Sequence, residues 1–200
     1  MDINIHSNGD QAQDSTLDGL EAVKANHQGA EAQRLIIEHA GLLRPEQLSR
    51  AANLGVGLSA ASHYVHYMGD TYAQSIGERV AYITPLASAA KLGMPVTLHS
   101  DAPLAPPQPL RAASVHITRS TRQGGVSTAS EQLSREQALK AITLDAAWSL
   151  GLESEFGSIQ VGKRADFTVL GQDPMQVEGA QWPQIDVWGV VLGGEPKPVK

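Results

Sequence analysis

The sequence has no cysteine, few aromatic residues and no long apolar run, and these absences exclude several classes of protein. Without cysteine, a transition-metal site has to use His, Asp or Glu side chains. Without about eighteen consecutive apolar residues, we expect no membrane partner. The basic residues are scattered and the formal net charge is −6, so we expect no nucleic-acid partner. The first residues lack the basic and apolar regions of a signal peptide, so we expect a cytoplasmic protein.

Short apolar runs alternate with helical patterns along the 200 residues. We expect strands over residues 3–6, 35–39, 55–59, 95–99 and 187–192, and two short strands around a glycine turn within 157–170. We expect helices over residues 15–26, 45–53, 78–92 (interrupted near Pro85), 109–122 and 134–150, and a long polar loop over 60–77. The alternation predicts an α/β protein with a parallel sheet.

Residues suited to metal chemistry stand at the ends of three predicted strands. His6 and His39 end the first two strands, and Asp101 follows the strand that ends at His99. The carboxyl ends of parallel strands meet at one edge, where two imidazoles and a carboxylate could converge on a metal. Asp101 could then move a proton from water to a leaving nitrogen. The alternatives are an exposed His6, a hydrogen-bonded core His39, and an Asp101 that caps the next turn.

Other residues allow less specific interpretations. His63 lies in the predicted loop, where a surface position and a role in binding substrate or metal are equally compatible with the sequence. His116 lies in a predicted helix and is expected to be solvated or packed. Glu38 precedes His39 and should face the opposite side of its strand, so we interpret it as structural. An α/β protein that binds a small molecule without a metal remains an alternative.

Five short motifs follow one another in the chain. They are HSNGD at 6–10, IEH at 37–39, SH at 62–63 followed by MGD at 68–70, SDAP at 100–103, and GSIxxGKxAD at 157–166. In this order they resemble the C-terminal half of the metal-dependent amidohydrolase superfamily, in its amidohydrolase-3 or YtcJ-like branch. The resemblance covers nearly the whole sequence. It implies a (β/α)8 TIM-type barrel, of which residues 1–152 would supply strands five to eight, and a small β-sandwich to which 153–200 would contribute.

The same resemblance implies hydrolysis of a non-peptide, amide-type C–N bond in a small-molecule substrate. It implies His6, His39 and Asp101 as metal ligands, with Asp101 also as the catalytic proton shuttle. We assign His63 and His99 to substrate binding. The implied cofactor is one or two divalent metal ions, zinc first, with iron and manganese as alternatives.

The sequence departs from the family pattern in its metal ligands. No His-x-His pair precedes residue 6, and no lysine stands on a predicted strand where a bridging lysine would be expected. We therefore expect the first half of the barrel to lie outside this chain. The site would be completed in a homo-oligomer or by a missing N-terminal half. The alternative is a truncated, catalytically incomplete fragment with no activity of its own.

Overall fold

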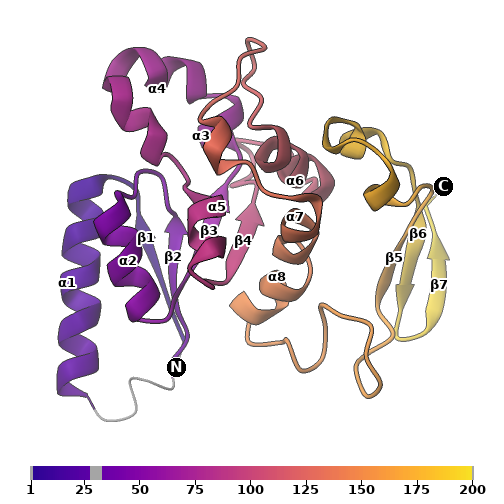
Figure 1. The fold of residues 1–200 in the computed structure, drawn as a ribbon. Coiled ribbons are helices and arrows are strands. Elements are labelled where there is room, and N and C mark those ends of the chain that lie inside the picture. Colours follow the sequence, from indigo (N-terminus) through magenta and orange to yellow (C-terminus); the bar gives the residue numbers. More distant parts are fainter. Residues whose placement is uncertain (1, 28–32, 200) are drawn as a thin grey trace.

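A computed structural model of the chain describes residues 2–27 and 33–199 (Figure 1). Its main sheet has four parallel strands in the order β1-β2-β3-β4, which confirms an α/β protein with a parallel sheet. The strands are β1 (Ile3–Ser7), β2 (Leu35–His39), β3 (Val56–Ala61) and β4 (Val96–His99). Within the described residues this sheet does not close on itself, because β1 and β4 lie at its two edges.

Helices connect the strands and cover the sheet. They are α1 (Asp10–Asn26), α2 (Pro45–Asn53), α3 (His63–His66), α4 (Gly69–Ile76), α5 (Leu86–Lys91), α6 (Pro109–Thr118), α7 (Arg135–Ala141) and α8 (Leu144–Ser149). Figure 1 shows α1 and α2 side by side along the first strands, while α6 to α8 lie beyond β4. In the part of the chain described, no helix is long and apolar enough to cross a membrane.

Alternate strand residues build the core beneath the helices. In register, Leu35 of β2 lies beside Val56 of β3, and Leu58 of β3 lies beside Val96 of β4. All four are buried and belong to one apolar cluster with residues of the covering helices. Since neighbouring side chains of a strand point to opposite faces, the residues between them face the other side of the sheet.

The other side of the sheet is covered near the strand amino ends by α8. Trp148 of α8 lies so close to Gly57 of β3 that a Cβ there would be 2.4 Å from the indole ring. The Asp145 carboxylate of the same helix accepts a hydrogen bond from the backbone N–H of Val96, at 3.3 Å. Helix α8 therefore packs against the sheet at the amino ends of β3 and β4.

Several predicted boundaries were wrong because tertiary contacts decide them. The helix expected from residue 15 begins at Asp10, and Asp14 within it accepts hydrogen bonds from Gln47 of α2 and from Arg44, which precedes α2. The helix expected over 134–150 is divided into α7 and α8. A capping box begins α7, with the Ser134 hydroxyl accepting from the Gln137 N–H at 3.1 Å.

The segment 60–77 is largely helical and was wrongly expected to be a loop. It continues β3 to Ala61 and then forms α3 and α4. The residues that pack these short helices stand four positions apart, at Tyr64, Met68, Tyr72 and Ile76. That spacing is helical and would have predicted the helices. Over residues 78–92, a 3-10 helix (Gly77–Tyr82) precedes α5.

The last part of the chain forms a separate antiparallel sheet of three strands, β5 (Phe167–Leu170), β6 (Val187–Leu192) and β7 (Glu195–Pro198). The two strands expected within 157–170 are one, because the segment before β5 is irregular, with Ile159 85% exposed. β7 was not predicted because it contains two prolines. It pairs only with β6, and an edge strand tolerates proline.

Candidate metal and catalytic site

Three histidines come together at the carboxyl edge of the main sheet, and we call His6, His39 and His99 the histidine cluster. The ring centroids of His6 and His39 are 4.5 Å apart, and those of His39 and His99 are 5.1 Å apart. They end or nearly end β1, β2 and β4. The parallel topology predicted from the strand order therefore brings these side chains to one place.

Left-handed backbone at two site residues turns their side chains. His39 has φ = 75° and Asp101 has φ = 53°, values that non-glycine residues rarely adopt. Regular alternation would have placed His39 on the helix side with Leu35 and Ile37. Its ring instead contacts His6 and His99. Strain of this kind is concentrated at functional sites in proteins.

Asp101 lies next to the histidine cluster rather than in a helix cap. Its Oδ2 is 4.0 Å from Nδ1 of His39, and its side chain is partly exposed. Burial, first of all, lowers the pKa of His39, and the neighbouring His99 and His6 add to this effect. His39 is therefore a neutral imidazole at pH 7, which is the form that binds metals.

His63 and Tyr64 enclose the site from α3. The ring centroids of the two residues are 4.3 Å apart, and the ring centroid of Tyr64 lies 5.9 Å from that of His39. Burial lowers the pKa of His63 and raises the pKa of Tyr64 to about 12, with the Asp101 charge also acting on both. His63 is buried within a helix, which does not fit the surface interpretation of the sequence. Sequence reasoning did not single out Tyr64 as a site residue.

Glu38 was also missed as a site residue. Its Oε2 lies 3.8 Å from Nε2 of His99, so the two side chains share one face of the sheet. Burial lowers the pKa of His99, and Glu38 opposes that shift. Regular alternation places Glu38 opposite His39, but the left-handed backbone of His39 turns its ring to the face that Glu38 and His99 share.

The donor atoms at this edge suit a divalent metal in kind but are too few in number. Nδ1 of His39, Nδ1 of His63 and Nε2 of His99 are buried and have no hydrogen-bond partner in the described part of the chain. Such nitrogens are suitable metal or substrate contacts. Yet within residues 2–27 and 33–199 no group of three His, Asp or Glu side chains is placed to hold one ion. The set of His6, His39 and Asp101 stays a prediction.

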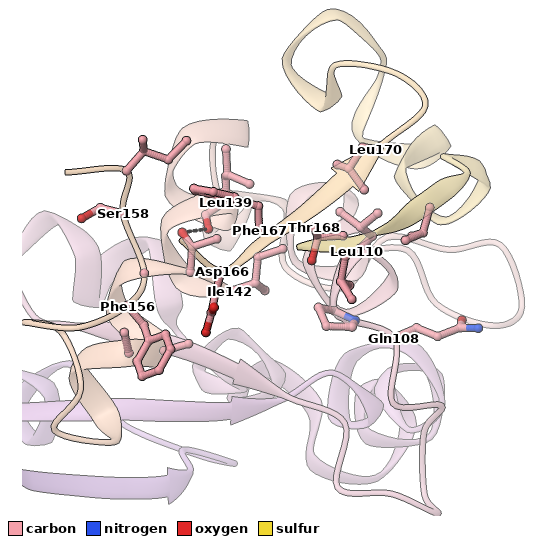
Figure 2. A pocket seen from close by; sticks show the side chains of 18 of the residues that line it. Gln108, Leu110, Leu139, Ile142, Phe156, Ser158, Asp166, Phe167, Thr168 and Leu170 are labelled. Carbon is pink, nitrogen blue, oxygen red and sulfur yellow. Dashed lines mark hydrogen bonds between the residues drawn. The ribbon is translucent and has the colours of Figure 1, made fainter. Parts of the chain in front are cut away.

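A cavity of about 1040 Å³ lies elsewhere, between helices α6 to α8 and the small sheet. Figure 2 shows side chains of its lining, among them Leu139 of α7, Ile142 just after α7, and Phe167 and Leu170 of β5. No residue of the histidine cluster lines it. The imidazoles and the carboxylate that could bind a metal or move a proton lie instead at the carboxyl edge of the sheet.

Fold and site together define a parallel α/β protein with its reactive groups at the carboxyl edge of the sheet. A family model described as "Amidohydrolase family" matches residues 1–197. The chain therefore belongs to the amidohydrolase family, and the resemblance found in its motifs is confirmed.

Individual relatives agree with this assignment. The chain is 30% identical to an N-substituted formamide deformylase of Arthrobacter pascens, over 97% of this chain and 36% of the relative. It is 30% identical to the putative amidohydrolase YtcJ of Bacillus subtilis, over 98% of this chain and 37% of the relative. A crystal structure of an uncharacterized metal-dependent hydrolase from Pyrococcus furiosus is similar, with a TM-score of 0.74, 27% identity, and coverage of 88% of this chain and 34% of that one. The chain thus spans about a third of the length of these relatives.

Proposed function

We propose that the chain supplies part of the active site of a metal-dependent hydrolase that cleaves a non-peptide, amide-type C–N bond. The observation that carries this proposal is the convergence of His6, His39 and Asp101 at one edge of the parallel sheet. The similarity to a formamide deformylase and to a metal-dependent hydrolase supports the same chemistry.

In this proposal His6 and His39 hold a divalent metal together with Asp101, and one or two ions occupy the complete site. Zinc suits imidazole and carboxylate donors, and iron and manganese are the alternatives. When bound, the metal acts as a Lewis acid that makes water a nucleophile near neutral pH. The lowered pKa of His39 keeps its ring available as a ligand.

Asp101 carries the proton in the proposed reaction. Its carboxylate accepts a proton from the water whose oxygen attacks the carbonyl carbon of the substrate. The same carboxyl group then donates this proton to the leaving nitrogen as the C–N bond breaks, which yields an acid and an amine. His63 and His99 contact the substrate, since each has a buried ring nitrogen without a partner in the described residues.

We further propose that β1 to β4 are strands five to eight of a (β/α)8 barrel and that residues 153–200 belong to a β-sandwich. The two open strand edges and the incomplete ligand set of the described residues support a site that further residues complete. A second copy of the chain or an N-terminal half would provide them. The second candidate is a fragment inactive on its own, favoured because no three-ligand group forms among the described residues.

The metal assignment can be tested with single histidine variants. After zinc loading and dialysis, His39→Ala should retain much less zinc than the parent protein, because an inner-sphere imidazole is lost. His27→Ala is the matched control, since His27 is exposed at the end of α1. Unchanged zinc content in His39→Ala would contradict the ligand assignment.

The proton shuttle is tested in the completed enzyme. Addition of the N-terminal half should restore hydrolysis of an N-formyl amine, and Asp101→Asn should then remove turnover while zinc content stays the same. If the completed parent is active and Asp101→Asn keeps a similar rate, Asp101 is not the shuttle. If the completed parent shows no hydrolysis, the inactive-fragment candidate is the better one.

A further inference from the structure

An open groove lies beside Asp101, outside the histidine cluster. It has a volume of about 960 Å³ and is lined by His66, Tyr67, the loop 102–107 and Arg122. We call it the Arg122 groove. The loop that forms one wall follows Asp101 directly in the chain, so this wall begins at the proposed proton shuttle. A substrate whose scissile bond lies at Asp101 can extend along it.

The loop wall is apolar and offers few hydrogen-bond donors. Pro103, Pro106 and Pro107 have no backbone N–H, and Leu104 is 61% exposed. Tyr67, on the opposite wall, is exposed as well. This groove therefore favours a ligand with an apolar body along most of its length.

Arg122 is held at the groove by a short hairpin in which Ser120 pairs with Val126. Its backbone N–H donates to the carbonyl oxygen of His66 at 2.7 Å. The His66 Nδ1 is 3.0 Å from the carbonyl oxygen of Ser120. The guanidinium carbon lies 5.8 Å from the centroid of the Tyr67 ring. These hydrogen bonds hold the main chain of Arg122 next to His66, so that its guanidinium lies near the ring of the neighbouring Tyr67.

The acidic residue near this hairpin is already engaged. Asp70 accepts hydrogen bonds from the Thr121 hydroxyl at 2.8 Å and from the Gln123 N–H at 3.4 Å. It forms no ion pair with Arg122 within 4.0 Å. Among the arginines of residues 2–27 and 33–199, Arg122 alone has a guanidinium with neither an ion pair nor a hydrogen bond. The guanidinium groups of the other arginines form ion pairs with carboxylates, or donate hydrogen bonds to backbone carbonyl oxygens or to a side-chain amide oxygen.

We propose that Arg122 binds a carboxylate of the substrate, so that the enzyme acts on amides with an apolar body and an anionic end. A guanidinium binds a carboxylate through two parallel N–H···O bonds, and its position over Tyr67 limits its freedom. The role of the bound molecule as a substrate rests on the proposed function. Binding of the anion does not, because it requires no metal and no turnover.

The test is isothermal titration of the full chain, kept in EDTA, with phenylacetate and the neutral phenylacetamide. Phenylacetate should bind at least about tenfold more tightly than phenylacetamide. Arg122→Gln should remove this preference, and Arg111→Gln, at an exposed arginine of α6, should retain it. Tyr67→Ala should weaken binding of both compounds.

Two results would overturn the proposal. One is equal affinity of the parent for the two compounds, and the other is an unchanged preference in Arg122→Gln. Binding of phenylacetate that requires zinc and ignores Arg122 would place the carboxylate on the metal, and would also reject this subsite. A control titration with zinc in place of EDTA tests this last outcome. All other titrations contain EDTA, so they test anion binding at Arg122 even if the proposed metal site is wrong.

Discussion

Arg119 should be the residue whose loss most destabilises the region beside the site. Its side chain is fully buried at the end of α6. Nε donates to the carbonyl oxygen of Ser127 at 2.8 Å, Nη1 to that of Thr84 at 3.1 Å and Nη2 to that of Ile83 at 2.9 Å. Burial lowers the pKa of Arg119 to about 10, so it is still charged at neutral pH.

The magnitude follows from the groups that Arg119→Met would leave behind. Methionine fills much of the stem but gives no donor to the three buried carbonyl oxygens. Each unsatisfied acceptor costs roughly 1–3 kcal/mol, and removal of a desolvated charge offsets part of this. We expect the free energy of unfolding to fall by about 3 kcal/mol. The backbone strain at Arg119, with φ = 56°, is the same in both proteins and cancels.

Urea denaturation followed by circular dichroism measures this change. Arg111→Met is the matched control, since Arg111 is exposed on the same helix, and its effect should stay within about 0.5 kcal/mol. A loss in Arg119→Met no larger than that of the control would refute the reasoning that the buried guanidinium supports these carbonyls. Since Arg119 precedes the Arg122 hairpin, its loss should also weaken phenylacetate binding.

Two further predictions concern stability. Burial holds the pKa of His116 well below 6.5, so below about pH 6.5 the unfolded chain binds a proton that the folded chain does not. Stability should fall as the pH drops through this range, and His116→Phe should reduce the slope by up to about 1.4 kcal/mol per pH unit in urea titrations; an unchanged slope would contradict this. Gly57→Ala should destabilise by about 1–3 kcal/mol because its Cβ meets the Trp148 ring. Gly19→Ala, in an open position of α1, should instead stabilise by about 0.5–1 kcal/mol, and thermal melts of both variants would show opposite signs.

The sequence was sufficient for features that depend on local pattern. The strand at Leu35–His39 and the helix at Pro45–Asn53 lie where periodicity and Pro45 predict them. The proximity of the ends of β1 and β2 also followed from the sequence, because parallel strands carry their ends to one edge. These inferences required only alternation, spacing and strand order, whereas the contact between the His6 and His39 rings also depends on the left-handed backbone of His39.

What the sequence missed depends on backbone twists and distant partners. Regular register places Glu38 on the face of His99, and His39 reaches that face only because its backbone leaves the regular strand conformation, which no period reveals. Arg119 carries a charge and would be expected at the surface. It is buried because carbonyl oxygens distant in the sequence accept its hydrogen bonds. The ion pair of Asp14 in α1 with Arg44, which precedes α2, is likewise a contact between residues distant in the sequence.

Native mass spectrometry of the zinc-loaded chain tests the central claim most directly, because it reads molecular mass and bound metal together. If the histidine cluster and Asp101 form a metal site, zinc should be bound in a discrete species, and His39→Ala should lose it. The mass of that species would also show whether a second copy is present. Metal-free protein in every species after zinc loading would contradict the account.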